Sequence, residues 1–166
     1  MLEIKNHENI CEIQMCRAPV NALNLEFVDQ LIQAFTRANE KPECDAIVLT
    51  AKKGVFSAGL DVVELATNDQ QEIKHFWSRF FKLLETIACS SVPVAAAITG
   101  HSPAGGAVMC LFADYRVMSE GKYLIGLNEA RVGLIIPRLL QDAMARLVGQ
   151  KTAEHMMLSG SLVKPA

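Results

Sequence analysis

Several common signatures of function are missing from this 166-residue sequence. It has no block of lysine or arginine and a net charge of -2, so a nucleic-acid or anionic-membrane partner is not indicated. The longest apolar stretch, residues 92–113, contains Gly100, Pro103 and other interruptions, which exclude a membrane-spanning helix. Residues 1–5 lack the apolar core of a signal peptide and the composition of a transit peptide.

Clustered cysteine and histidine are also missing. The five cysteines form no C-x-x-C pair, and most of them lie in apolar segments. We interpret them as reduced side chains of a cytoplasmic protein, and we expect no metal site. The sequence contains no phosphate-binding G-x-x-x-x-G-K-[ST], no G-x-G-x-x-G after a strand and no G-x-S-x-G, which excludes the usual nucleotide and serine-hydrolase motifs.

What is present is typical of a single globular domain over residues 1–166, with 51% hydrophobic and 20% charged residues. Alternating strands and helices predict an α/β fold, with the C-terminal helical region starting at about residue 137. Strands are predicted at residues 2–5, 10–16, 44–51, 92–98, 115–118 and 123–125. Helices are predicted after an Asn24 cap and at residues 70–88, 107–112, 139–148 and 151–158.

The stretch from Thr99 to Asp114 is the most informative part of the chain. Ser102 and Pro103 have the residue types of a helix N-cap and first helical position. On that interpretation the N–H groups of residues 104–106 are free donors at the positive end of a helix. They predict a site for an anion or for an oxyanion that develops during a reaction, and the alternative is a tight turn that only packs closely.

A second loop of small residues, 57–61, follows another apolar strand. In α/β sheets, ligands bind at the carboxyl ends of the strands, so both loops are expected to face one site. One N–H group from each loop can then bind the same oxygen. Such a pair stabilises an enolate or a tetrahedral oxyanion, and loss of one donor typically costs about two to three orders of magnitude in rate.

Four segments together resemble the crotonase (enoyl-CoA hydratase/isomerase) superfamily, and the resemblance runs over essentially the whole chain. Within the superfamily they are most similar to the mitochondrial-type Δ3,Δ2-enoyl-CoA isomerase branch. The segments are Phe56-Ser57-Ala58-Gly59-Leu60-Asp61, the run from Thr99 to Arg116, Gly126-Leu127-Asn128-Glu129 with Gly133, and the loop of residues 19–27.

The resemblance implies a spiral of repeated ββα units that holds a fatty acyl-CoA thioester. It places the two oxyanion donors on Ala58 and Gly105. The coenzyme A moiety is part of the substrate, so no separate cofactor is expected. Substrate-binding positions implied by the resemblance are Ala58, Gly59, Leu60, Asp61, Val62, Gly105, Asn128, Asn21 and Ala22.

One carboxylate decides the predicted reaction. Relatives that hydrate a double bond use two glutamates; the second aligns with Glu129, but the first aligns with Val108, which cannot transfer a proton. The resemblance therefore implies a 1,3-proton shift by Glu129 from C2 to C4 of a 3-enoyl-CoA, an isomerase step of fatty-acid β-oxidation. Such a shift needs an apolar pocket that excludes water and raises the pKa of the carboxyl.

Other interpretations stay open from the residues alone. Glu129 also fits an exposed loop carboxylate, and Asp61 fits a helix cap better than a proton carrier. The chemistry could instead be that of a superfamily hydratase, decarboxylase or thioester hydrolase, or the chain a truncated CoA-binding or assembly module. Family members continue well past residue 166 and form trimers or dimers of trimers. We therefore expect Leu158 and Leu162 to lack their usual cover and the chain to self-associate.

Overall fold

Five strands form the larger of two sheets in the computed structural model, which describes residues 1–165. Their order is β1-β2-β3-β5-β7. β1 (Leu2–His7) and β2 (Ile10–Met15) pair antiparallel as a hairpin, as predicted, but β1 extends beyond the predicted residue 5. The turn is therefore short and includes Glu8, whose φ is 54°.

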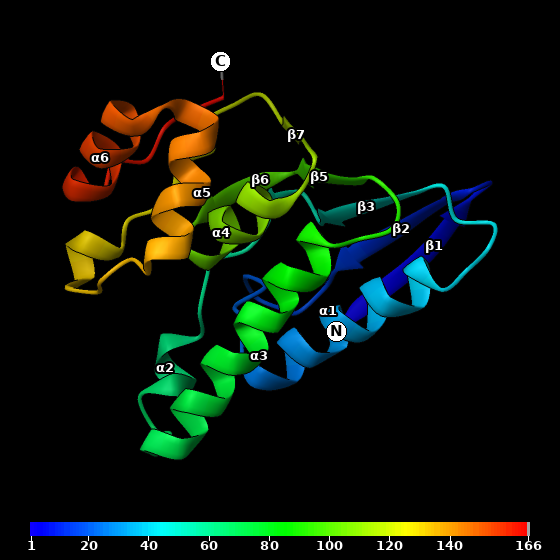
Figure 1. The fold of residues 1–166 in the computed structure, drawn as a ribbon, viewed down its shortest axis with the longest axis horizontal. Helices are drawn as coiled ribbons and strands as arrows, with labels where there is room; N and C mark the ends of the chain where they lie inside the picture. The colour runs from blue at the N-terminus through cyan, green and yellow to red at the C-terminus, as the bar shows by residue number, and fades with distance from the viewer. Residues whose placement is uncertain (166) are drawn as a thin grey trace.

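The rest of this sheet is parallel, because each strand returns to it through a helical connection. β3 (Ala46–Ala51) follows helix α1 (Leu25–Asn39), and β5 (Val94–Ile98) follows α3 (Gln70–Ala88). β7 (Tyr115–Met118) completes the sheet beside β5. Figure 1 shows α1 and α3 packed side by side against the sheet. The α/β prediction is confirmed.

The predicted Asn24 cap of helix α1 is confirmed. Asn24 caps it by accepting a hydrogen bond from the backbone N–H of Phe27 at 3.0 Å. Its apolar side chains recur at helical spacing and form one buried face. That face is made of Phe27, Val28, Leu31, Ile32, Phe35 and Ala38.

A second, smaller sheet contains β4 (Gly54–Val55), β6 (Gly100–Pro103) and β8 (Ile125–Gly126), all parallel. Each of these strands comes soon after a strand of the larger sheet, which produces the expected ββα repeat. Gly100 lets β6 lie close to β4 within the smaller sheet. A Cβ at this position would lie 2.1 Å from the carbonyl of Gly54, so only glycine fits.

The predicted cap of helix α4 (Gly105–Phe112) is wrong. Ser102 and Pro103 belong to β6, and Ser102 donates its N–H to the carbonyl of Leu124 at 2.8 Å. Ala104 makes the turn with a φ of 47°, and its N–H donates to the Gly126 carbonyl at 2.9 Å. Pairing with β8 therefore occupies the Ala104 donor that we expected to be free.

The C-terminal part consists of the 3-10 helix η1 (Glu129–Val132), α5 (Arg138–Val148) and α6 (Gln150–Ser159). Figure 1 shows α5 and α6 at the end of the molecule opposite the β1–β2 hairpin. Several of their large apolar side chains are exposed, including Leu158 as expected. None of the helices formed by residues 1–165 is long and apolar enough to cross a membrane.

Candidate active site

The loops singled out in the sequence meet at a small cavity of about 50 Å³ between α3, α4, η1 and the start of α5. Most of its wall is apolar, and Glu129 is the one charged residue among those that line it. The lining residues are Leu60, Trp77, Phe80, Gly105, Val108, Glu129, Leu134, Ile135, Pro137 and Leu140. The fold thus brings one residue of each small-residue loop and the predicted base to one place.

Ala58 does not supply the donor that the resemblance placed on it. Its N–H donates to the Val20 carbonyl at 2.9 Å. Along the same loop, the N–H of Gly59 donates to the Ser57 hydroxyl.

The N–H groups of Asp61 and Val62 are also used, by the carbonyls of Leu23 and Leu60 respectively. Among the five N–H groups from residues 58–62, only that of Leu60 has no acceptor within residues 1–165. The available donor is therefore that of Leu60, which lines the cavity.

Gly105 supplies the second free donor. It is the first residue of α4, where a helix leaves N–H groups without intrahelical acceptors, and no acceptor for it lies within residues 1–165. A Cβ at Gly105 would lie 3.2 Å from both the Gly59 Cα and the Leu60 Cδ2 atom. Glycine at this position therefore allows the two donor loops to approach each other closely.

Glu129 faces this cavity from the first turn of η1. Its Oε2 atom is inaccessible to solvent and has no hydrogen-bond partner within residues 1–165. Burial raises the pKa of the Glu129 carboxyl, against a smaller opposing effect of a backbone hydrogen bond. A half-buried carboxyl with an unpartnered oxygen and a raised pKa is a candidate general base, so the structure does not support the exposed-loop interpretation.

The remaining walls of the cavity are apolar. Val108 is 1% exposed and stands one turn into α4, where it offers no group for proton transfer. Trp77 and Phe80 from α3 pack edge to face, with ring centroids 5.9 Å apart. These side chains suit an apolar ligand group and reduce the contact of the carboxyl with water.

The structure keeps other predicted binding residues away from this cavity. Asn128 is not among its lining residues, and its Oδ1 atom is buried without a partner within residues 1–165. Asn21 is 6% exposed and donates its side-chain amide to the Phe56 carbonyl at 2.9 Å. The Ala22 carbonyl accepts from Arg17 at 2.8 Å, so the polar groups of this loop mainly hold the fold together.

Asp61 is a helix cap and not a free ligand for substrate. Its side chain accepts the Glu64 N–H at the start of α2 (Val62–Leu65) and pairs with the Arg17 guanidinium at 2.8 Å. The prediction that Asp61 caps a helix is confirmed. Its carboxylate is therefore already engaged, and the expectation that the residue contacts substrate stays a prediction.

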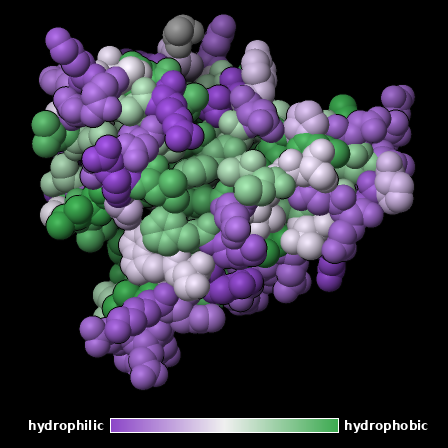
Figure 2. All heavy atoms as spheres, in the orientation of Figure 1, coloured by the Kyte–Doolittle hydropathy of each residue, from purple (hydrophilic) through white to green (hydrophobic). Residues whose placement is uncertain are grey.

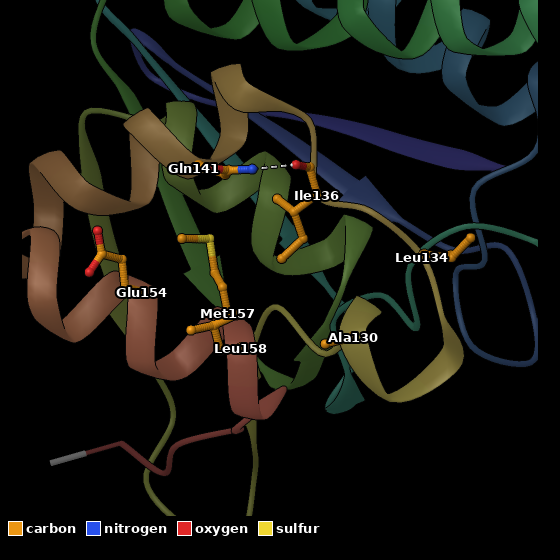
Figure 3. A pocket seen from close by; sticks show the side chains of 7 residues that line it. All are labelled: Ala130, Leu134, Ile136, Gln141, Glu154, Met157 and Leu158. Carbon is orange, nitrogen blue, oxygen red and sulfur yellow. Dashed lines mark hydrogen bonds between the residues drawn. The ribbon is translucent and has the colours of Figure 1, made fainter.

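A larger cavity of about 290 Å³ lies beside the first, between η1, α5 and α6. Figure 3 shows that Leu134, Ile136, Met157 and Leu158 contribute apolar side chains to it, and that Gln141 donates to the Ile136 carbonyl at 2.7 Å. Leu134 also lines the smaller cavity, so the two spaces share a wall. Because Glu129 lines only the smaller cavity, we place the chemistry there.

The sequence did not indicate that Leu60 carries the free donor. It also did not indicate that Arg17 pairs with Asp61, the residue after Leu60. The acceptors that occupy the Ala58 and Asp61 N–H groups belong to Val20 and Leu23, on a separate loop. No spacing within residues 57–61 indicates which N–H those acceptors leave free.

The fold and site define a class: an α/β protein with an apolar cavity lined by one half-buried carboxyl and by two residues whose backbone N–H groups have no acceptor within residues 1–165. Comparison with known proteins gives the family. The sequence profile of the family described as Enoyl-CoA hydratase/isomerase matches residues 5–166. The chain belongs to this family, whose fold is the crotonase fold.

Two relatives illustrate the likeness. The chain is 32% identical to Enoyl-CoA delta isomerase 1, mitochondrial, of Rattus norvegicus, covering 100% of this chain and 58% of the relative. It is 34% identical to the Homo sapiens protein of the same name, covering 89% of this chain and 50% of the relative. The chain thus spans little more than half the length of these curated relatives.

The solved structures agree on the fold. The crystal structure of human mitochondrial delta3-delta2-enoyl-CoA isomerase superposes with a TM-score of 0.96 at 30% identity, over 99% of this chain and 65% of that one. The crystal structure of an enoyl-CoA hydratase from Bacillus anthracis superposes with a TM-score of 0.93 at 25% identity, over 98% and 64%. The predicted fold is therefore confirmed.

Proposed function

We propose that this chain carries the active site of an acyl-CoA isomerase that moves a double bond from position 3 to position 2. The observation that supports it most is that the cavity is lined by one carboxyl, that of Glu129, and by a valine at position 108. One carboxyl can take up and return a proton, whereas hydration in relatives uses two. The similarity to proteins named as delta isomerases supports the same reaction.

The proposed reaction uses only groups of this chain. The thioester oxygen accepts hydrogen bonds from the Leu60 and Gly105 N–H groups. The Glu129 carboxylate takes a proton from C2 of the 3-enoyl-CoA, and the electron pair moves into the thioester to give a dienolate. The protonated carboxyl then returns the proton to C4, which forms the 2-trans-enoyl-CoA and regenerates the carboxylate.

Each element of the site has a separate contribution. The two donors stabilise negative charge as it develops on the oxygen, and in many enzymes this stabilisation lowers the barrier more than any other effect. The raised pKa of Glu129 brings its proton affinity closer to that of the carbon acid. The apolar walls keep water from quenching the dienolate.

The binding of the coenzyme A moiety is part of the same proposal. The loop of residues 58–62 presents its backbone near the cavity. Lys52 and Lys53 line a separate surface cavity of about 220 Å³ with Arg17 and Asn21. We propose that the pantetheine runs along residues 58–62, so that the thioester reaches the two donors.

The test is direct. The protein is mixed with 3-hexenoyl-CoA, and formation of the conjugated thioester is followed by ultraviolet absorbance. Turnover without added metal or redox cofactor supports the proposal. Binding of the acyl-CoA without turnover contradicts it and favours a CoA-binding or assembly module.

Self-association and location also stay predictions. The exposed apolar side chains of the C-terminal part, with Ile135 at 90% and Leu158 at 82%, support self-association, and the trimer is the form that the family resemblance implies. Figure 2 shows apolar side chains on the surface of this end of the molecule. A monomer at micromolar concentration in light scattering would contradict it. The cytoplasmic location stays untested, and the matched relatives are named as mitochondrial.

A further inference from the structure

The loop that carries the Leu60 donor is well packed before Leu60 and poorly packed after it: Ser57 and Gly59 are buried, and Leu60 packs against the core. Helix α2, which follows it directly, contributes no buried residue, and Val62 and Val63 are 58% and 78% exposed. By contrast, the Gly105 donor begins a helix in which residues 105–110 are all buried. On the side that follows Leu60, the backbone is therefore held largely by polar contacts.

Two backbone hydrogen bonds hold Leu60 beside Leu23. The Leu23 N–H donates to the Gly59 carbonyl at 2.8 Å, and the Asp61 N–H donates to the Leu23 carbonyl at 3.0 Å. These two bonds form a parallel bridge between Leu23 and Leu60. The direction of the Leu60 N–H therefore depends on how firmly the backbone around Leu23 is held relative to the Leu60 loop.

One side chain joins both sides of this bridge. The Arg17 guanidinium donates to the Ala22 carbonyl at 2.8 Å, one residue before Leu23. It also pairs with the Asp61 carboxylate at 2.8 Å, one residue after Leu60, and lies 3.6 Å from the Glu64 carboxylate.

The planar fork of arginine can make these contacts together, which the single ammonium of lysine cannot do in the same geometry. The Arg17 and Asp61 side chains are only 19% and 18% exposed, so solvent screens their pairing weakly.

We propose that Arg17 is a positioning residue for the oxyanion donor: it holds the Leu60 N–H toward the thioester oxygen by clamping Ala22 to Asp61. This inference rests on the proposed function. Arg17 acts through Leu60 and does not touch the reacting atoms. A displaced donor weakens stabilisation of the dienolate more than binding of the ground-state thioester.

The experiment compares Arg17→Gln with a matched control, Arg79→Gln. Arg79 pairs with Asp29 at 2.6 Å, between α3 and α1, and does not line the candidate cavity. Both variants lose one arginine–aspartate pair, but only the first loosens the Leu60 loop. The readouts are the infrared carbonyl band of bound hexanoyl-CoA with a labelled thioester carbonyl, and kcat and KM for 3-hexenoyl-CoA.

Hexanoyl-CoA has no double bond to move, so its carbonyl band reports hydrogen bonding alone. In the wild-type protein we expect the band at lower frequency than in water. Arg17→Gln is expected to return the band part of the way and to lower kcat about tenfold, with KM within about twofold. Arg79→Gln is expected to leave the band and kcat unchanged, and Arg17→Lys to fall between wild type and Arg17→Gln.

Several outcomes overturn the proposal. An unchanged band in Arg17→Gln would show that Arg17 does not position the donor. An equal shift in Arg79→Gln would show a general structural effect. A rise in KM at constant kcat would place Arg17 on the coenzyme A instead. If Arg17→Gln does not fold, Arg17→Lys provides the same comparison.

The two proposals fail in different ways. A wild-type protein that lowers the band of hexanoyl-CoA but does not isomerise 3-hexenoyl-CoA contradicts only the proposed reaction. A wild-type band at its value in water overturns both.

Discussion

Two regions of this molecule meet at the candidate site, and they differ in how their apolar residues are used. In residues 1–127 the helices cover the sheet, and the largest fully buried side chains, such as Phe27 and Phe80, all lie there. In residues 128–165 many large apolar side chains are exposed, with Ile135 at 90%, although Leu140 and Met144 are buried. The first region supplies the two backbone donors, and the second supplies the carboxyl.

The two regions meet different physical requirements of the proposed site: fixed donors in the first and a base that exchanges a proton in the second. Donors stabilise a developing charge only when they are fixed in advance, and the buried helix α4 provides that for Gly105. The base must instead exchange a proton and reach two carbons. It lies on η1, a single turn without buried residues that ends at Gly133 with a φ of 72°.

The largest expected effect concerns the one catalytic side chain of the second region. Glu129→Gln should lower kcat by about two to four orders of magnitude, because the amide cannot accept the C2 proton. The matched control is Glu120→Gln, which changes an exposed carboxyl that does not line the cavity. Turnover of 3-hexenoyl-CoA measures both, and near-normal turnover in Glu129→Gln would exclude it as the base.

A smaller effect is expected from the first region. Gly105→Ala places a Cβ 3.2 Å from the Gly59 Cα and Leu60 Cδ2 atoms, so the two donor loops must separate slightly. We expect kcat to fall about ten- to a hundredfold, less than the full loss of a donor. Unchanged kcat in a folded variant would contradict the close approach of the two loops.

A matched pair of leucines tests the contrast in packing. Leu31 is 0% exposed in α1, and Leu158 is 82% exposed in α6. Leu31→Ala should cost about 2–5 kcal/mol in free energy of unfolding, whereas Leu158→Ala should change it by less than about 0.5 kcal/mol. Urea denaturation measures both, and a large loss for Leu158→Ala would show that another surface covers this residue in solution.

The smallest effect is on the pH dependence of the reaction. Because burial raises the pKa of Glu129, its carboxyl takes up a proton at a higher pH than an ordinary glutamate does. The ionised form is the active one, so kcat/KM should fall about tenfold per pH unit below that raised pKa and level off above it. An acid limb at the ordinary glutamate pKa would show that the carboxyl is solvated.

Much of the fold follows from local pattern, and the errors share one cause. The predictions for helices α1 and α3 hold because their buried faces recur at helical spacing over several turns. The Ser102 cap fails because β8 pairs with residues 102–103, and a distant strand overrides a local preference for capping. The strand predicted at residues 123–125 lies instead at Ile125–Gly126 for the same reason.

The α/β alternation and the two small-residue loops could be predicted from residue type and from spacing within one segment. The roles of Glu129 and Val108 followed from the resemblance to the crotonase superfamily. Only the tertiary structure decided which loop N–H groups are free, and it replaced Ala58 with Leu60. A backbone donor is available only if no acceptor from elsewhere in the fold occupies it. The acceptors that decide this, Val20 and Leu23, approach the loop only in the folded chain.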